Sequence, residues 1–129
     1  MERRRRGNMN FEIHTEPISD HVFVVALSGE VDLYVAPELK QQLLEVVGRG
    51  AKHVIVDLTN TTFVDSTTLG VLIGIVRRLR ANEGQLSVVC SDRNVAKTFE
   101  LTGLDRVFAM YETREQAIAA LDGGLRIPA

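Results

Sequence analysis

The sequence is poor in cysteine and in aromatic residues, and each shortage excludes a class of protein. Cys90 is the single cysteine among 129 residues, so the chain has no intramolecular disulfide framework and no cysteine-rich zinc site. Tryptophan is absent and aromatic residues make up 5% of the chain, which leaves few side chains for stacking on nucleic acid bases. We therefore expect an aliphatic core and a reducing compartment.

Long hydrophobic runs are also missing. The longest strongly apolar segment, Leu69 to Val76, is far shorter than the roughly 20 residues that a bilayer requires. No apolar stretch follows the arginines near the amino end, so no export signal is expected. With 45% hydrophobic and 25% charged residues, the composition is typical of one globular domain. We expect a single-domain cytoplasmic protein with no contact with a membrane.

The formal net charge of −2 is unevenly distributed. Glu2 and the arginines Arg3 to Arg6 together carry +3, so the rest of the chain carries −5. An acidic domain disfavours binding to a phosphate backbone, and no direct nucleic acid partner is expected. We interpret the arginines as a solvated extension, with a nucleic-acid arm as the alternative. A further hypothesis makes Met9 the true start, because a purine-rich ribosome-binding sequence translates largely as Glu, Arg and Gly.

Hydrophobic periodicity predicts strands and helices in the order ββαβαβαβα. The expected strands are 11–14, 22–27, 53–58, 86–90 and 107–110, and the expected helices are 36–48, 66–81, 92–101 and 113–121. The first two strands should form an antiparallel pair, and the turn-prone residues 59–62 should end the third. The predicted fold is α/β, with a mixed sheet of about five strands and about four packed helices. We expect a disordered extension at 1–10, one domain at 11–122 and a flexible tail at 123–129.

Several enzyme classes lack their residues here. The glycines and lysine of a P-loop are absent, and the three histidines have no metal-ligand spacing. Asp57 could serve as the phosphoacceptor of a receiver domain, but the acid pair and the lysine of that class are missing. No nucleophile has a positioned base in the sequence. We expect a non-enzymatic protein without cofactor or metal, and the alternative from another class is an enzyme acting on a nucleotide or small molecule.

Hydroxyl groups gather where a loop is predicted to become a helix. The segment FVDSTTLG, residues 63–70, places Asp65, Ser66, Thr67 and Thr68 at this junction. A helix N-cap explains one such side chain, because its oxygen accepts the free N–H groups of the first turn. Three adjacent hydroxyls exceed what one cap needs, so a binding or modification site is a second interpretation.

The helix after these hydroxyls is apolar nearly all round, from Leu69 to Val76, and carries Gly70 and Gly74 on one face. A helix with one face in water normally has a polar side. One explanation is burial between the sheet and neighbouring helices, with the glycines permitting close backbone approach. The other is a partner-docking stripe formed by Val71, Gly74 and Ile75.

From residue 11 to residue 121, the chain resembles the anti-sigma factor antagonists of the STAS superfamily. The resemblance is carried by GEVD at residues 29–32, VDL at 56–58 and VDSTTLGVLIG at 64–74. A weaker element, LTGLDRVF at 101–108, lies at the family's usual distance. The resemblance implies a STAS domain in which the unphosphorylated protein binds an anti-sigma factor and so releases a sigma factor for transcription.

The resemblance also implies a set of functional residues. By position, the family's phosphorylated serine is Ser66, its kinase is the anti-sigma factor itself, and a phosphatase reverses the modification. Thr68 stands where the family commonly has glycine, and Thr67 and Thr68 are the rival acceptors. An alternative within the same fold is a regulatory subunit of a membrane transporter. The expected partner-binding residues are Asp32, Asp65, Thr67, Thr68 and Val71.

Overall fold

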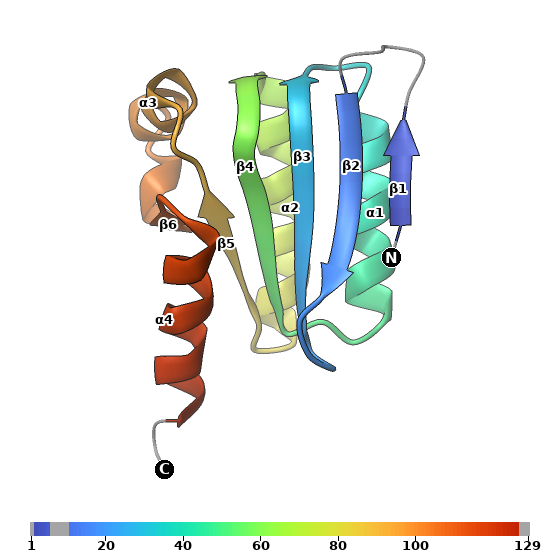
Figure 1. The fold of residues 1–129 in the computed structure, drawn as a ribbon, viewed down its shortest axis with the longest axis vertical. Helices are drawn as coiled ribbons and strands as arrows, with labels where there is room; N and C mark the ends of the chain where they lie inside the picture. Colours follow the sequence, from blue (N-terminus) through green and yellow to red (C-terminus); the bar gives the residue numbers. More distant parts are fainter. Residues whose placement is uncertain (1, 6–10, 127–129) are drawn as a thin grey trace.

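A computed structural model describes the backbone of residues 2–5 and 11–126, and the side chains of residues 11–121. Its six-stranded sheet has its strands in sequence order (Figure 1). The first three strands are antiparallel neighbours and the last four are parallel neighbours. The strands are β1 (Glu2–Arg5), β2 (Phe11–Pro17), β3 (Val22–Val31), β4 (His53–Val64), β5 (Gln85–Val89) and β6 (Ala109–Tyr111).

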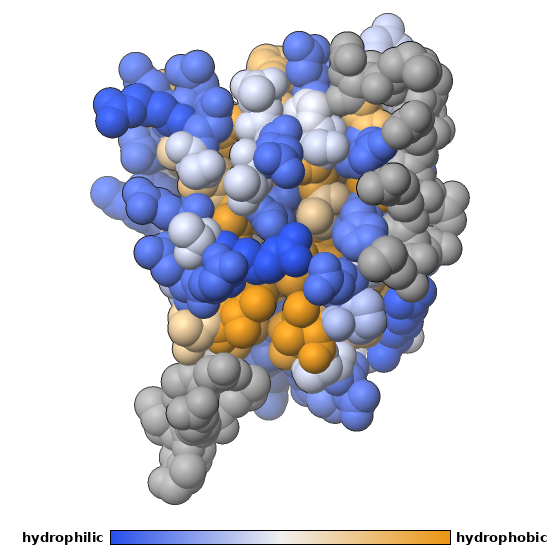
Figure 2. All heavy atoms as spheres, in the orientation of Figure 1, coloured by the Kyte–Doolittle hydropathy of each residue, from blue (hydrophilic) through white to orange (hydrophobic). Residues whose placement is uncertain are grey.

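Helices cover the two faces of the sheet unequally. Helices α1 (Ala36–Gly48) and α2 (Ser66–Ala81) lie on one face, and α4 (Arg114–Arg126) lies on the other (Figure 1). The larger core lies beneath α1, α2 and α3 (Arg93–Leu101), and it is aliphatic apart from four phenylalanines and Cys90. A smaller core joins Ala117 and Leu121 of α4 to Val24, Ile55 and Val89 of the sheet. Helix α4 lies beside β4 to β6 and leaves much of the β2–β3 face uncovered. That part of the face carries many hydrophilic side chains (Figure 2).

The expected α/β fold, with a mixed sheet and four helices, is confirmed. Strands β2 to β6 are the five that the periodicity predicts, and α2 has the predicted bounds. Among the helices of the described chain, none is both long and apolar enough to cross a bilayer.

Strand β4 is longer than predicted, and its length positions the site. Residues 59–62, expected as a turn, remain in the strand. Pairing with β3 continues across register shifts at Ala26/Ser28 and Gly29/Glu30, because β-bulges absorb an offset without ending a ladder. Val64 therefore pairs with Val31, and the carboxyl ends of the two strands lie side by side.

Part of each terminal segment forms regular secondary structure that its composition does not predict. Glu2–Arg5, expected within a disordered extension, forms β1 against β2, because an edge strand supplies backbone hydrogen bonds whatever the side-chain charge. Helix α4 continues through Gly123 to Arg126, past the predicted end at Leu121, since glycine weakens a helix by about 1 kcal/mol without forbidding it. The hypothesis of a start at Met9 lies outside the described residues, as does the end of the tail.

Candidate functional site

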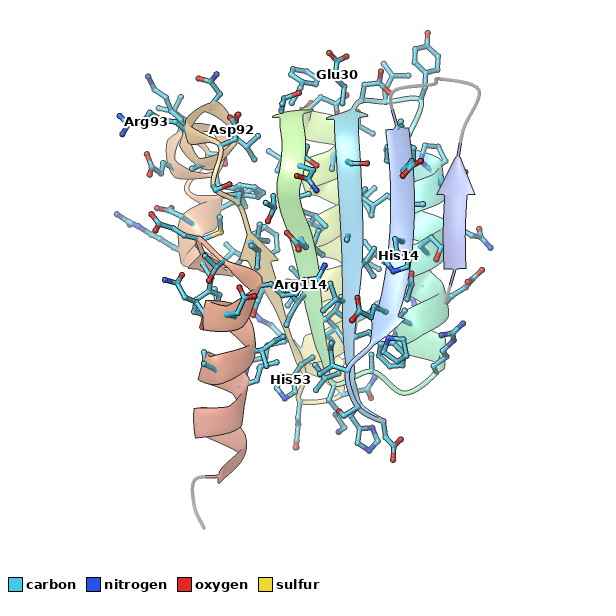
Figure 3. All side chains as sticks on the ribbon, in the orientation of Figure 1. His14, Glu30, His53, Asp92, Arg93 and Arg114 are labelled. Atoms are coloured by element: carbon cyan, nitrogen blue, oxygen red, sulfur yellow. The ribbon has the colours of Figure 1, made fainter. Side chains whose placement is uncertain are left out.

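The candidate site lies where β3 and β4 end and α2 begins. The N–H of Asp65 donates to the carbonyl oxygen of Val31 at 3.3 Å, so the first residue after β4 is fixed to the last residue of β3. Asp32 follows Val31 directly, and Glu30, labelled in Figure 3, marks the same end of the sheet. The parallel pairing thus brings together Asp32 and Ser66, which are far apart in the sequence.

The Asp32 carboxylate organises the loop that leads into α1. Its Oδ1 accepts the backbone N–H groups of Tyr34 at 3.0 Å and Val35 at 3.3 Å. Val35 is the N-cap of α1 and makes no side-chain cap of its own. Asp32 therefore has a structural role in addition to the partner-binding role predicted for it.

Asp65 is the N-cap of α2. Its backbone is extended, and its Oδ1 accepts the N–H of Thr68 at 3.0 Å. This geometry satisfies one of the free N–H groups of the first turn, as the cap interpretation predicts. Ser66 and Thr67 follow on the exposed side of the turn, and neither hydroxyl has a hydrogen-bond partner among the described residues. Both hydroxyls are therefore accessible from solvent.

Thr68 is buried, unlike Ser66 and Thr67. Its burial corrects the prediction that Thr68 is a partner-binding residue and a rival acceptor. Its side chain is 0% exposed. Its Oγ1 lies 3.2 Å from the carbonyl oxygen of Val31 and 3.1 Å from Oδ1 of Asp65. The third residue of the helix turns toward the core, so Thr68 joins α2 to β3 and is inaccessible to a kinase in this conformation.

The glycines of α2 do not pack against a neighbouring backbone of the domain, although one interpretation of the sequence proposed that they would. Leu69, Leu72 and Val76 are buried, and Val71 is half-buried against the main core. Gly70 and Gly74 are exposed, and a Cβ added to either would meet nothing within 4 Å. Close backbone approach therefore does not explain these glycines.

Three large apolar side chains beside the site were not identified from the sequence. Leu33 is 55% exposed, Tyr34 72% and Phe63 49%. Leu33 and Tyr34 follow Asp32, while Phe63 lies near the end of β4 opposite Glu30. Their exposure depends on the loop geometry, and the only signal in the sequence was an apolar pair directly after Gly29–Asp32. We call the group Asp32, Leu33, Tyr34, Phe63, Asp65, Ser66 and Thr67 the β3–β4 end surface.

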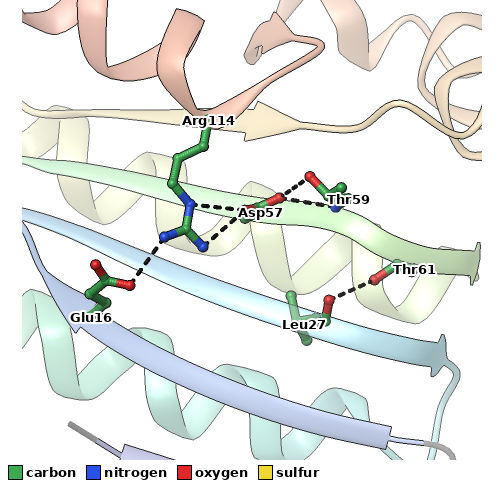
Figure 4. A network of polar contacts seen from close by, with 6 residues as sticks. All are labelled: Glu16, Leu27, Asp57, Thr59, Thr61 and Arg114. Carbon is green, nitrogen blue, oxygen red and sulfur yellow. Dashed lines mark hydrogen bonds and ion pairs between the residues drawn. The ribbon is translucent and has the colours of Figure 1, made fainter.

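A separate polar network lies on the face that carries α4 (Figure 4). Arg114 donates to Oδ2 of Asp57 from Nε at 3.1 Å and reaches Oε1 of Glu16 with Nη1 at 3.1 Å. Burial opposes the charged form of Arg114, but the hydrogen bonds and charges of Asp57 and Glu16 outweigh it and raise its pKa above the ordinary value. The Asp57 side chain is 9% exposed, and its carboxylate also accepts from the N–H of Thr59, so it is engaged in structure and poorly placed as a phosphoacceptor.

The Cys90 thiol is buried. Burial raises the pKa of the Cys90 thiol, and the charges of Asp92, Glu100 and Glu112 raise it further, so the thiol stays protonated and weakly nucleophilic. No group of three or more histidine, cysteine or acidic side chains in the described part of the chain could hold a metal ion.

Known proteins resemble this chain in sequence and fold. The family model "STAS domain" matches residues 15–117. The anti-sigma-B factor antagonist of Staphylococcus aureus is 32% identical over 84% of this chain and 97% of its own length. An anti-sigma factor antagonist from Mycobacterium paratuberculosis is 32% identical, with a TM-score of 0.78 over 85% of this chain and 92% of its own.

A further solved structure is similar to this chain in fold, but its sequence identity is too low to indicate more than the fold. The anti-sigma factor antagonist SpoIIAA in its unphosphorylated form is 23% identical, with a TM-score of 0.77 over 86% of this chain and 96% of its own. The family match extends from β2 into α4, and two relatives are 32% identical to this chain over more than four-fifths of its length. This chain belongs to the STAS domain family.

Proposed function

We propose that the chain is an anti-sigma factor antagonist that binds its anti-sigma factor through the β3–β4 end surface and is switched off by phosphorylation of Ser66. The observation that carries the proposal is the position of Ser66: exposed, unpartnered among the described side chains, and beside Asp32 and Asp65. Relatives that are 32% identical over 84% of this chain and 97% of their own length are named anti-sigma-B factor antagonists, which supports this function.

The apolar part of the surface supplies the binding energy. Aromatic side chains such as Tyr34 and Phe63 bury a large area at little entropic cost, and such residues dominate protein interfaces. Their exposure in the free domain leaves them available to a partner. The carboxylates and hydroxyls around them provide directional contacts at the rim.

A phosphoryl group at Ser66 would act on binding and leave the fold intact. It adds a charge of about −1.5 to −2 at pH 7, and the N–H groups and dipole at the start of α2 tolerate an anion there. Asp65 and Asp32 already place negative charge nearby. The added charge therefore concentrates at the docking surface, where a loss of about 3 kcal/mol weakens binding roughly a hundredfold.

The proposed switch is part of a cycle in which the anti-sigma factor binds either the antagonist or the sigma factor. In the proposed cycle, the anti-sigma factor is also the serine kinase, the unphosphorylated antagonist releases the sigma factor for transcription, and a phosphatase restores Ser66. The chain itself performs no reaction in this cycle, which we place in the cytoplasm. Its role is that of a binding module whose affinity depends on one hydroxyl.

Mapping the modified residue tests this proposal. The purified chain is incubated with the anti-sigma factor of its own organism and ATP, and the phosphorylated peptide is identified by mass spectrometry. We expect one phosphate on Ser66 and none on Ser66→Ala. Thr62→Val is the matched control, because it removes an exposed hydroxyl outside the β3–β4 end surface and should leave incorporation unchanged. Modification of Thr67 in the wild-type chain, or none at all, would contradict the assignment.

A further inference from the structure

A groove runs between α1 and α2 on the face opposite α4. Its volume is about 350 Å³. The α2 residues lining it recur every three or four positions and so share one face of the helix, and from Thr67 to Arg78 they extend roughly 16 Å. The groove is lined by Lys40, Leu44, Thr67, Gly70, Val71, Gly74, Ile75 and Arg78.

The fold gives no reason for the two glycines in this groove. Alanine is the better helix former, and at Gly70 and Gly74 a Cβ would meet open space. The domain would therefore be more stable with alanine at either position. What the glycines provide is room: they leave the backbone of α2 bare along the groove, so that a second helix can approach closely over the apolar floor of Val71 and Ile75.

The charge of the groove is opposite to that of the domain. Lys40 and Arg78 are exposed, and neither has an ion-pair partner among the described residues. None of the lining residues is acidic, although the chain beyond residue 6 carries −5. These two cations beside an apolar floor complement a helix that has an apolar stripe and acidic residues next to it.

We propose that the α1–α2 groove binds an acidic amphipathic helix of the anti-sigma factor, an inference that rests on the proposed function. Thr67 lines the groove and is adjacent to Ser66, so the groove opens directly onto the β3–β4 end surface. A helix bound here brings its acidic residues toward Lys40 and Arg78. A phosphate on Ser66 at the mouth of the groove repels that helix, so phosphorylation weakens binding of the anti-sigma factor.

Filling the groove separates this proposal from a purely structural role. Gly74→Leu places a side chain in the groove, while Ala81→Leu adds the same side chain at an exposed position of α2 outside it. Affinity for the anti-sigma factor is measured by isothermal titration calorimetry. We expect Gly74→Leu to weaken binding at least tenfold and Ala81→Leu less than threefold. Gly74→Ala should raise the melting temperature by about 3 °C, which shows that the position tolerates a side chain.

Charge reversal tests the acidic character of the bound helix. Arg78→Glu alters the groove, and Arg77→Glu makes the same change at the neighbouring exposed residue, which does not line it. We expect Arg78→Glu and Lys40→Glu each to weaken binding about tenfold at 0.05 M salt, with a smaller effect at 0.5 M because salt screens the charges. Arg77→Glu should cost less than threefold.

The outcomes distinguish the groove from the function on which it rests. If the wild-type chain does not bind the anti-sigma factor, the proposed function fails and the groove proposal fails with it. If the wild type binds, and Gly74→Leu and Arg78→Glu bind equally well, the function stands and the groove proposal is wrong. If Gly74→Leu instead abolishes self-association in analytical ultracentrifugation and leaves binding unchanged, the groove receives a second copy of this chain and our assignment is overturned.

Discussion

The Oγ1 atom of Thr68 lies 3.2 Å from the carbonyl oxygen of Val31, and this contact joins the first turn of α2 to the end of β3. The same hydroxyl lies 3.1 Å from the carboxylate of Asp65, which caps the helix. One buried side chain therefore fixes the exposed Ser66 relative to the loop that begins at Asp32. The geometry of the β3–β4 end surface therefore depends in part on a buried residue that is not part of it.

Thr68→Val should therefore destabilise the domain. Valine has nearly the same shape but leaves the Asp65 and Val31 oxygens with one hydrogen-bonding group fewer, a change that costs about 1–2 kcal/mol in the free energy of unfolding. The measurement is urea denaturation. Thr67→Val is the control, because the exposed Thr67 hydroxyl has no partner among the described residues. Equal stability of the two variants would show that the Thr68 hydroxyl is not a structural tie.

The network around Arg114 should stabilise the packing of α4 on the sheet. The Asp57 side chain is 9% exposed and the Glu16 side chain 41% exposed, so loss of a partner matters more at Asp57. We expect Arg114→Ala to lower the free energy of unfolding by about 1–3 kcal/mol, and Glu16→Gln by less than about 1 kcal/mol. Urea denaturation gives both values, and the reverse order would contradict the account.

His53 should make stability depend on pH. Burial lowers its pKa below the ordinary 6.5, the charge of Lys52 lowers it further, and its Nδ1 has no partner among the described groups. Between the lowered pKa and 6.5, the unfolded chain binds more protons than the folded chain, so stability rises with pH across that interval. The difference in urea midpoint between pH 5.5 and 7.5 should shrink in His53→Gln. An unchanged difference, equal to that of a His14→Gln control, would contradict this prediction.

The exposed apolar residues should contribute to partner binding without stabilising the fold. We expect Tyr34→Ala and Phe63→Ala each to weaken binding of the anti-sigma factor about tenfold or more, and to leave the melting temperature nearly unchanged. Ile18→Ala is the control, because Ile18 is 39% exposed and lies in the turn at the opposite end of β3. Calorimetric titration gives the affinities, and equal binding by all three variants would exclude an apolar contact here.

Asp32→Ala should lower both the stability of the domain and its affinity for the anti-sigma factor. Its carboxylate caps the loop before α1 through Tyr34 and Val35, so the variant should lose about 1 kcal/mol of stability as well as affinity. Asp32→Asn keeps an oxygen acceptor and removes the charge, and it should restore most of the stability. A full return of affinity in Asp32→Asn would show that the loop geometry, and not the charge, serves binding.

Local patterns predicted the elements, and long-range pairing decided the rest. The bounds of α2 follow from the Asp65 cap and from periodic apolar residues, both of which are local signals. The burial of Thr68 could not be predicted, because it depends on the end of β3, 37 residues earlier in the chain. The exposure of Phe63 likewise depends on its pairing with Glu30 of β3, and that of Tyr34 depends on the loop that the Asp32 carboxylate organises. The pairing of Glu2–Arg5 with β2 was hidden by their charge.

The most direct test of the central claim compares one protein in two states of modification. The affinity of the anti-sigma factor is measured by calorimetry for the chain phosphorylated on Ser66, for the unmodified chain and for Ser66→Ala. We predict equal binding by the unmodified chain and Ser66→Ala, because a methyl group adds no charge, and binding about a hundredfold weaker by the phosphorylated chain. Circular dichroism should show the same secondary structure in all three. Undiminished binding by the stoichiometrically phosphorylated chain would contradict the switch.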